Sequence, residues 1–312
     1  MFPLLLLVGC NGCTPKIPDV VDPDTQDDTD TDTAADTADS SVTDTGPFLP
    51  PRCDFEEVEP NDQASLAMAI PMEVWGCGVM MPANPKNAPF GDADYFTFTA
   101  AEPGWVEVRV DAASRGSAAD MQFIVYDDDD SITVADSYLT TDPILRFPAP
   151  DPTDYTVILG ETSLLFGDDY TWFLLSSLVK APVEWTFNEV EPNDDFATAT
   201  TFAPGGTVFG TVGEAGDFDW YHIVTPKEAT YVRFTMTAFK QGSPVDGQVV
   251  LYANDGTTVL VDDRRGEIEY DLDPWFERAQ TGTNDWYVLV RNEEEKGSRF
   301  HWYTLSIEAL VE

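Results

Sequence analysis

Basic residues and histidine are scarce in this chain of 312 residues, which has 16 Lys and Arg and only 2 His. Acidic residues far outnumber them, with 57 Asp and Glu, so the formal net charge is -41. A negative charge of this size repels phosphate backbones and anionic lipid surfaces. Nucleic acid is therefore excluded as an expected partner, and cations, cationic surfaces and neutral polymers remain.

Catalytic motifs are missing as well. Neither His222 nor His301 lies near a serine in a nucleophile-elbow motif, and the zinc motif His-Glu-x-x-His does not occur. A hydrolase that works with two carboxylates is left open as an alternative, because acidic residues occur throughout the chain. We expect the protein not to be an enzyme.

The opening apolar run, Phe2 to Val8, is too short to cross a bilayer as a helix. Its length suits the apolar region of an export signal, which we predict over residues 1–9. The stretch Leu7-Val8-Gly9-Cys10 resembles a bacterial lipobox, which implies lipidation of Cys10. No Lys or Arg precedes the run, unlike in an ordinary signal. We expect an exported protein, lipid-anchored to the bacterial cell envelope at the outer membrane or cell surface.

Residues 10–52 are predicted to be a disordered tether rich in Asp and Thr. Its stretch DVVDPDTQDDTDTDTAADTADSSVTDTG has no Lys, Arg or aromatic residue. So little apolar surface cannot offset the entropy that folding would cost, and like charges extend the segment. The repeated Asp suggests a calcium loop as an alternative, but the glycine and final Glu of an EF-hand are missing.

The four cysteines have different expected fates. Cys10 is assigned to lipid, and Cys13 in the tether is left open as a free thiol or an intermolecular link. Export places Cys53 and Cys77 in an oxidising compartment, where cysteines pair. A disulfide between them would fix the end of the tether to the first folded domain.

Five sequence blocks occur twice, in the same order and with similar spacing. Such repetition indicates two copies of one domain, which we predict over residues 53–181 and 182–312. The paired blocks are Glu57–Asp62 with Glu189–Asp194, Gly91–Phe96 with Gly216–Tyr221, Asp120–Asp127 with Asp246–Ala253, Asp154–Gly160 with Asp285–Arg291, and Tyr170–Ser176 with Tyr303–Ala309.

Each copy has the pattern of β-strands. Segments such as WVEVRV and YVRFTMT are short and rich in β-branched and aromatic residues, and Gly, Pro, Asn and Asp separate them. Val106, Val108 and Val110 alternate with Glu107 and Arg109, as in a strand with one buried face. The predicted fold class is all-β, with two tandem antiparallel, jelly-roll-like β-sandwich domains after the tether.

The motifs of the repeat resemble a known bacterial family. An opening Glu-x-Glu-Pro-Asn-Asp, a Gly-x-Val, and a Gly-Asp-x-Asp before an aromatic residue are similar to the pre-peptidase C-terminal domain. They are similar also to the collagen-binding domains of bacterial collagenases. The resemblance covers nearly all of residues 54–312, and the second copy fits better because the first inserts MMPANPKNAPF. It implies a secreted β-sandwich beside a peptidase or other extracellular enzyme; some relatives bind calcium, and a few bind collagen or other polymers.

Two matching sets of acidic and amide residues are the candidate metal ligands. Glu57 and Glu59 project from one side of an extended arm, which Pro60 stiffens before a turn at Asn61 and Asp62. Carboxylates gathered without a counter-charge either take up protons or bind a cation. Oxygen ligands suit Ca²⁺ better than zinc or copper, and the resemblance implies one Ca²⁺ in each domain. The sets are Glu57, Glu59, Asn61, Asp62, Asp92 and Asp94, and Glu189, Glu191, Asn193, Asp194, Asp217 and Asp219.

The same residues also have purely structural interpretations. The Asn-Asp pair of each arm would cap a short helix. Asp92 and Asp217 would be turn residues beside glycine. The two glutamates of each arm would form a solvated strand face. Caps and metal ligands are compatible with each other.

Aromatic residues near a predicted loop form a candidate ligand platform, namely Trp275, Phe276 and Trp286. Aromatic rings in a loop can stack on sugar rings or hold a peptide, and the alternative is that they cover the edge of the sandwich. We expect a non-catalytic lipoprotein whose two calcium-stabilised modules bind an extracellular polymer or protein. A structural spacer, or an accessory subunit of a secreted peptidase or other extracellular enzyme complex, is the alternative.

Overall fold

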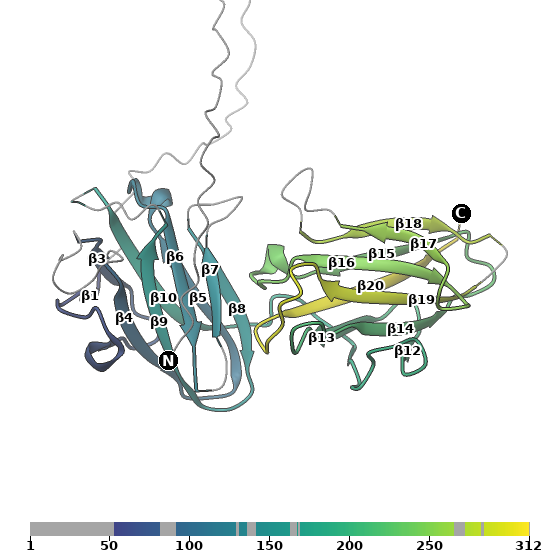
Figure 1. The fold of residues 1–312 in the computed structure, drawn as a ribbon, viewed down its shortest axis with the longest axis horizontal. Coiled ribbons are helices and arrows are strands. Elements are labelled where there is room, and N and C mark those ends of the chain that lie inside the picture. Colours follow the sequence, from purple (N-terminus) through teal and green to yellow (C-terminus); the bar gives the residue numbers. More distant parts are fainter. Residues whose placement is uncertain are drawn as a thin grey trace, which may run out of the picture. The chain divides into compact units, whose positions relative to one another are not determined.

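The computed structural model describes residues 53–81, 92–128, 131–135, 142–162, 167, 169–264, 272–281 and 284–311. The predicted signal peptide, Cys10, Cys13 and the tether over 10–52 lie outside these residues. The described residues form two domains whose regular secondary structure is almost entirely β-strand (Figure 1). None of them forms a helix that is long and apolar enough to span a membrane.

The first domain is a sandwich of two five-stranded sheets. One has the order β1-β3-β10-β5-β8, formed by Phe55–Glu56, Gly76–Val79, Thr171–Val179, Gly104–Asp111 and Ile144–Ala149. The other has the order β2-β4-β9-β6-β7, formed by Met68–Ala69, Asp94–Ala100, Thr153–Glu161, Met121–Tyr126 and Ser131–Ala135. Two short 3-10 helices, η1 and η2, cover Ala64–Leu66 and Ala113–Arg115.

The second domain repeats this architecture strand for strand. One sheet has the order β11-β13-β20-β15-β18, formed by Phe187–Asn188, Thr207–Thr211, Trp302–Leu310, Tyr231–Thr237 and Trp275–Ala279. The other has the order β12-β14-β19-β16-β17, formed by Thr200–Phe202, Asp219–Val224, Asp285–Asn292, Gly247–Ala253 and Val259–Asp263. The 3-10 helix η3 covers Phe239–Gln241, in the place of η2. The prediction of an all-β fold with two tandem sandwiches is confirmed.

Strand direction departs from a purely antiparallel sandwich at one place in each sheet. The short strands β1, β2, β11 and β12 run parallel to their neighbours β3, β4, β13 and β14. All other paired strands of the described residues are antiparallel. Each parallel pair adds the opening arm of a domain to the edge of a sheet, so one arm contacts both sheets.

The core follows the alternation of the sequence. Val106, Val108 and Val110 of β5 are fully buried, while Glu107 between them turns outward to pair with Arg146 at 2.6 Å. Each buried aliphatic side chain contributes about 1.5–3 kcal/mol relative to an exposed one. The sandwich core is therefore assembled from the inward residues of both sheets, as the two-residue period predicts.

Cysteine chemistry sets the first domain apart. Cys53 and Cys77 form a disulfide with a Cα–Cα distance of 5.7 Å. The bridge joins the residue two positions before β1 to the second residue of β3, whereas the second domain contains no cysteine. The predicted domain limits at 53, 181 and 312 remain predictions, and the strands themselves run over Phe55–Val179 and Phe187–Leu310.

Candidate metal centres

The opening arm of each domain bridges the two sheets of its own sandwich. In the first domain, Glu57 N donates to Cys77 O of β3 at 2.9 Å, and Tyr95 N of β4 donates to Asn61 O at 3.1 Å. In the second, Glu189 N donates to Phe209 O, and Trp220 N donates to Asn193 O, both at 2.9 Å. Main-chain bonds thus fix both ends of the segment that carries the glutamates, and the acidic side chains lie where the arm crosses between the sheets.

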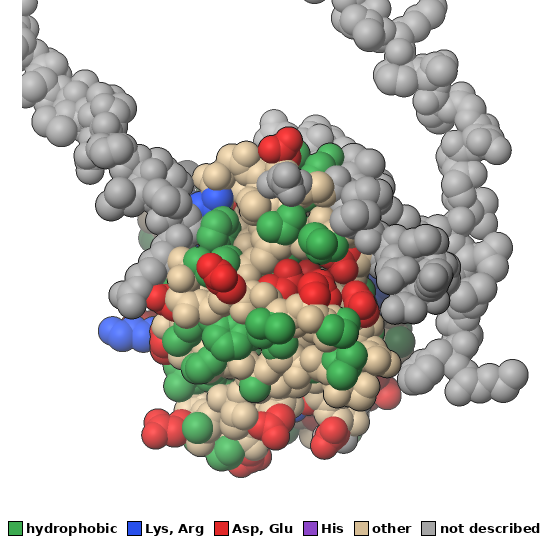
Figure 2. Space-filling model, turned by 90° about the vertical axis from the view of Figure 1, so that its left-hand side faces the viewer, with side chains coloured by type: hydrophobic (Ala, Val, Ile, Leu, Met, Phe, Trp, Pro, Cys, Tyr) green, Lys and Arg blue, Asp and Glu red, His purple; other side chains and the backbone are tan. Residues whose placement is uncertain are grey.

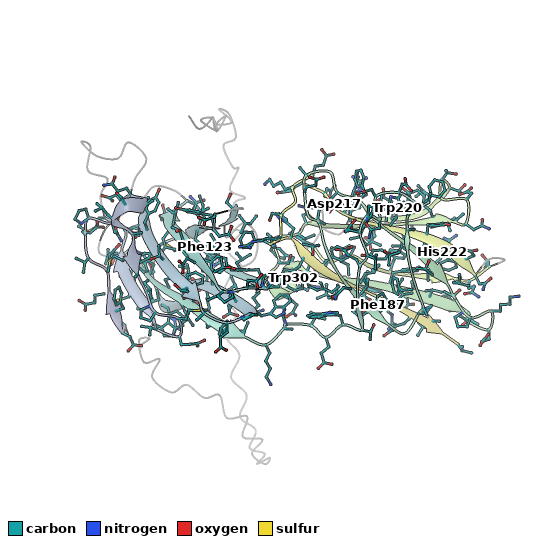
Figure 3. All side chains as sticks on the ribbon, turned by 90° about the horizontal axis from the view of Figure 1, so that it is seen from below. Phe123, Phe187, Asp217, Trp220, His222 and Trp302 are labelled. Atoms are coloured by element: carbon teal, nitrogen blue, oxygen red, sulfur yellow. A yellow bond between two sulfur atoms is a disulfide. The ribbon has the colours of Figure 1, made fainter. Side chains whose placement is uncertain are left out.

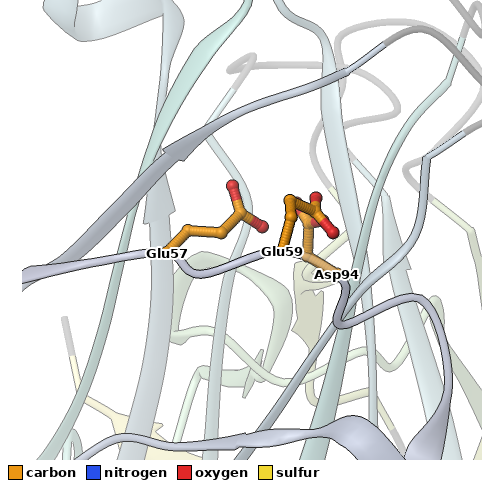
Figure 4. A group of neighbouring side chains, drawn as sticks. All are labelled: Glu57, Glu59 and Asp94. Carbon is orange, nitrogen blue, oxygen red and sulfur yellow. The ribbon is translucent and has the colours of Figure 1, made fainter.

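The predicted acids of the first arm do converge. Glu57, Glu59 and Asp94 each place an oxygen within 4.8 Å of the others, and Figure 4 shows the three carboxylates turned toward a shared space. A second group with the same limit shares Glu59 and adds Asp62 and Asp92. Five of the six predicted residues of the first set therefore form one continuous carboxylate cluster.

Asp94 is the most constrained member of this first cluster. Its side chain is fully buried, and neither Oδ1 nor Oδ2 has a hydrogen-bond donor among the described residues. Burial, and next the neighbouring Glu57 carboxylate, raise the pKa of Asp94 far above its ordinary value. A buried charge without a partner is costly, so this position requires either a proton or a bound cation.

Asn61 is the sixth residue, and it orients the arm. Its Nδ2 donates to Glu57 Oε1 at 3.0 Å, and its main-chain N donates to Glu59 Oε2 at 3.1 Å. Its Oδ1 is buried and has no donor among the described residues. The amide oxygen is therefore a further oxygen that a hard cation could satisfy.

Asp92 belongs to the second group of the cluster, with Glu59 and Asp62. Its Oδ2 accepts a hydrogen bond from Met81 N. Burial, and then the charges of Glu59, Glu57 and Asp62, outweigh that bond and raise the pKa of Asp92 to about 7. At neutral pH this carboxylate can therefore exchange a proton for a cation at little cost.

The second cluster has the same arrangement of carboxylates but more hydrogen-bond donors. Glu189, Glu191 and Asp219 place oxygens within 4.8 Å of one another. Asp219 is fully buried, yet the hydroxyl of Tyr303 donates to its Oδ2 at 2.7 Å. The hydroxyl of Tyr221 donates to Glu189 at 3.2 Å. Two phenols thus supply hydrogen bonds that the first cluster lacks.

Further donors reach the second cluster from the main chain and from the arm. Thr211 N donates to Glu189 Oε1 at 2.6 Å. With the Asn193 amide nitrogen turned toward the acids, it donates to Glu191 and Asp219 at 3.2 Å. Burial still raises the pKa values of Glu189 and Asp219, because it is the largest contribution at both.

Asp217 and Asp194 lie at the edge of the second cluster. Asp217 Oδ2 accepts from Gly213 N at 2.6 Å, and its pKa is raised by burial and then by the charge of Asp194. Asp194 itself is exposed. Neither completes a compact group with Glu189, so the second set is less tightly gathered than the first.

The difference between the clusters arises at two aligned positions. Trp172 pairs with Gly78 as Tyr303 pairs with Gly210, and Phe96 occupies the place of Tyr221 two residues after the buried aspartate. The alignment of Tyr170 with Tyr303 is therefore wrong by two residues. The error arose because both sequences contain a Tyr-Thr pair, Tyr170-Thr171 and Tyr303-Thr304. The strand register instead aligns Trp172 with Tyr303.

Glycine is needed beside each buried glutamate. A Cβ on Gly78 would lie 2.2 Å from Glu57 Oε2 and 2.4 Å from Trp172, and a Cβ on Gly210 would lie 2.6 Å from Glu189 Oε2. Real side chains do not approach so closely. Gly78 of β3 and Gly210 of β13 therefore leave room for the glutamates to reach the aspartates.

An open pocket of about 420 Å³ gives access to the first cluster. Its wall includes both arm glutamates, Glu57 and Glu59, and apolar side chains of β3 and β10 such as Phe173. Figure 2 looks onto the side of the molecule where β1 and β3 lie in Figure 1, and shows acidic side chains gathered among hydrophobic ones. Solvent and ions can reach this cluster without any opening of the sandwich.

The helix-cap interpretation is wrong for both arms. The residue that precedes η1 is Gln63, and its side chain makes no capping hydrogen bond. In the second arm, Asp195 Oδ1 accepts from Ala197 N at 2.8 Å and from Thr198 N at 3.1 Å. In the first arm, neither Asn61 nor Asp62 caps the helix η1. In the second arm, the residue that caps the turn is Asp195. The predicted Asn-Asp pairs are therefore left for the clusters.

The predicted aromatic platform is wrong for two of its three residues. Phe276 is 8% exposed and Trp286 is 1% exposed, and both stack on Phe234 in the core. Trp275 is 44% exposed. The reason is that this segment is strand β18 and not a loop, so alternation turns Phe276 inward, and Trp286 is an inward residue of β19.

Partly exposed rings that sequence reasoning did not combine into a site lie on the outer face of β14, β16 and β19. They are Trp220, His222, Tyr252 and Tyr287, with Phe196 from the arm. The alternation of Asp-Trp-Tyr-His-Ile-Val could have found Trp220 and His222, since Tyr221 and Ile223 are buried between them.

Neither histidine has the setting of a catalytic base. His222 Nε2 bonds Asp285 at 2.7 Å on the open sheet face, without a serine or cysteine in the contact. His301 Nδ1 bonds Ser298 Oγ at 2.8 Å, but both side chains are only 3% exposed. A substrate cannot reach the second pair, so these contacts support no nucleophilic mechanism.

No family model and no curated protein sequence matches the chain. Among solved structures, it is similar to the pre-peptidase C-terminal domain of a collagenase from Bacillus anthracis, with 13% identity and a TM-score of 0.29 over 38% of this chain and 99% of that one. It is similar also to tandem CBM51 modules of a family 98 glycoside hydrolase from Streptococcus pneumoniae, with 10% identity and a TM-score of 0.24 over 74% and 88%. Likenesses of this strength do not establish a ligand or a partner.

Proposed function

We propose that the protein is a non-catalytic binding protein of the bacterial cell envelope whose two sandwich modules are stabilised by Ca²⁺. The observation that carries the proposal is the buried Asp94 carboxylate, which has no hydrogen-bond donor among the described residues and faces Glu57 and Glu59. A cation at this position would offset the repulsion among these acids. The role of the acids is then to shape the domain and not to break bonds.

Calcium fits the residues present better than other common metals do. The first set offers five carboxylates and one amide oxygen, Glu57, Glu59, Asp62, Asp92, Asp94 and Asn61. Ca²⁺ takes six to eight oxygen ligands in flexible geometry, whereas zinc and copper favour nitrogen and sulfur. The second set would hold Ca²⁺ through Glu189, Glu191 and Asp219, with Asn193, Asp194 and Asp217 nearby.

The proposed effect of the ion is to lock each arm across its sandwich. The arm already contacts both sheets through main-chain bonds at Glu57 and Asn61. Neutralising the carboxylates would remove the repulsion that favours release of the arm. The modules would then present rigid sheet faces to an extracellular polymer or protein.

The cell-envelope location rests on the sequence of the first 52 residues. The apolar run, Cys10 and the acidic tether together support export, lipid anchoring and display away from the membrane. The net charge of -41 supports a ligand that is neutral or cationic.

The experiment is a calcium titration of the protein from which the signal peptide has been removed, followed by limited proteolysis. Calcium should protect the bonds near Glu57–Asp62 and Glu189–Asp194, and a chelator should restore cleavage there. Magnesium at the same concentration is the control, because it demands a tighter octahedral site. Identical cleavage patterns with calcium and with chelator would rule the proposal out.

A further inference from the structure

A row of partly exposed rings lies on the outer face of the second domain. It is called the aromatic row here and consists of Phe196, Trp220, His222, Tyr252 and Tyr287. His222 of β14 lies opposite Tyr287 of β19, which lies opposite Tyr252 of β16. Trp220 is two residues from His222 on the same face, and Figure 3 labels both on the ribbon.

The rings contact one another and hold a fixed arrangement. Ring centroids are 4.9 Å apart for Trp220 and Tyr252 and for His222 and Tyr287. Phe196 contacts Trp220 at 6.3 Å and Tyr287 at 5.9 Å, and is itself 43% exposed. Such contacts restrict the side chains before any ligand arrives, so little rotamer entropy is left to lose on binding.

Polar side chains border the row on both sides. Asp285 holds His222 at 2.7 Å, and Thr201 Oγ1 lies 3.5 Å from the other ring nitrogen. On the far side lie Asp262 and Arg291, which the buried Gln248 fixes by donating to Asp262 at 2.5 Å and accepting from Arg291. Donors and acceptors in fixed positions beside aromatic faces are the combination that orients a ligand with many hydroxyl groups.

The fold does not require these rings. In the first domain the aligned row reads Thr97, Thr156 and Tyr126, and Tyr95 stands in the place of Trp220. The same strands, order and register therefore form in the first domain with rings at only two of these four strand positions, Tyr95 and Tyr126. The presence of the aromatic row in the second domain calls for an explanation other than packing.

We propose that the aromatic row binds a neutral polysaccharide, with sugar rings stacked on Trp220 and Tyr287. This rests on the proposed function as a binding protein and names its ligand class. Anionic polymers are disfavoured by the net charge of -41. Extended peptides are disfavoured because β14, β19 and β16 are paired on both sides, which leaves no main-chain groups for a peptide on this face.

The row is also connected to the second candidate metal centre. Phe196 follows Asn193 and Asp194 in the arm, and Asp195 fixes the turn by accepting from Ala197 N and Thr198 N. Phe196 then packs against Trp220, the neighbour of the buried Asp219. An arm released from the cluster would carry Phe196 away from the row, so polysaccharide affinity should fall when calcium is removed.

The test is native affinity electrophoresis of the protein lacking only its signal peptide, in gels containing hydroxyethylcellulose, xylan or laminarin. Alginate serves as the anionic comparison and gelatin as the peptide comparison. At least one neutral polysaccharide should retard the protein. Trp220→Ala and Tyr287→Ala should each weaken that affinity about tenfold, a loss typical of one stacked ring. Trp220→Phe should restore most of it, which distinguishes stacking from unfolding.

Tyr95→Ala is the matched control in the first domain, and it should leave retardation unchanged. Retardation by none of the neutral polysaccharides would overturn the proposal. So would retardation that Trp220→Ala and Tyr287→Ala leave intact, or loss of gelatin binding in the same two variants. A protein that binds polysaccharide through Trp220 but shows no calcium protection would contradict the proposed metal role and leave the aromatic row standing.

Discussion

The two domains bury an equivalent aspartate and satisfy it in different ways. Asp219 accepts a hydrogen bond from Tyr303, whereas both oxygens of Asp94 lack a donor among the described residues. The positions that carry Tyr221 and Tyr303 in one domain carry Phe96 and Trp172 in the other. Since an unpartnered buried polar group costs free energy and a bonded one does not, the first domain should depend on a cation more strongly.

If the clusters bind calcium as proposed, one scaffold would support two degrees of metal dependence. Strand order, arm and glycine are the same in both domains. The change lies in two aromatic side chains: Phe96 lacks the hydroxyl that Tyr221 has, and Trp172 has an indole N–H where Tyr303 has a hydroxyl. On this proposal, substitutions at these two positions would make a duplicated domain less dependent on an ion for its stability without altering its sheets.

The largest expected effect comes from replacing the two buried aspartates, Asp94 and Asp219, one at a time. Asp94→Asn should weaken calcium binding at the first domain about 100-fold, since it removes a charged ligand. The same change should raise stability in chelator, because the folded domain then no longer has to protonate a buried carboxylate. Isothermal titration with calcium and thermal unfolding in chelator measure the two effects. Asp219→Asn is the matched variant and should raise stability in chelator less; equal gains from the two changes would contradict the comparison.

The disulfide offers the next test, because only the first domain has one. Replacing Cys53 and Cys77 by Ser should destabilise the first domain by about 2 kcal/mol, through the restored freedom of the unfolded loop. Hydrogen exchange resolved by domain is the measurement. Faster exchange in β3 and β10, with unchanged exchange in β13 and β20, is expected. An equal change in both domains would show that the bridge acts on more than its own arm.

The pH dependence of stability should change sign with calcium. Carboxylates whose folded pKa is raised, such as Asp92 at about 7, bind more protons in the folded state than in the unfolded state between pH 4 and 7. Stability in chelator is therefore fully present below the unfolded pKa, near 4, and is lost as pH rises through the folded pKa. The Tm should fall by about 5 °C between pH 4.5 and 7.5 in chelator.

With saturating calcium, the same pH rise should increase the Tm, because the ion binds the ionised carboxylates. Differential scanning calorimetry in the two conditions measures both trends. Parallel curves with and without calcium would mean that the clusters hold no ion.

The smallest expected effect comes from giving one domain the side chain that the other has at the same position. Tyr221→Phe places in the second cluster the side chain that Phe96 provides in the first, and removes the hydroxyl that donates to Glu189 at 3.2 Å. Stability in chelator should fall by about 1 kcal/mol, and the stabilisation by calcium should grow. The reverse change, Phe96→Tyr, should reduce calcium dependence in the first domain. Chemical denaturation of both variants, with and without calcium, measures these effects. Unchanged stability in both variants would contradict the prediction.

The repeat and the two-residue alternation were sufficient to predict the fold. Val106, Val108 and Val110 alternate with polar residues and are buried together, and the duplicated arm pointed to acids that do converge. Buried strand faces and turns can both be recognised in a sequence, because each depends on the pattern of neighbouring residues. Five residues of the first set could be named in advance for this reason.

What could not be predicted depends on pairing between distant strands. The opposition of Trp172 to Gly78 is a register property, and a shared Tyr-Thr pair misled the sequence alignment by two residues. The burial of Phe276 and Trp286 likewise follows from their positions in β18 and β19, although Pro274 beside Trp275 is typical of a loop. The aromatic row joins three strands and the arm, so no single segment shows it.

The bridge between Cys53 and Cys77 has a mechanical consequence. Tension that reaches Cys53 from its N-terminal side passes through the sulfur atoms into β3, and the intervening residues 54–76 carry none of it. The segment that holds Glu57, Glu59 and Asn61 is therefore shielded from pulling. A load on the chain would reach the first sandwich through covalent bonds and bypass the segment that carries the acidic cluster.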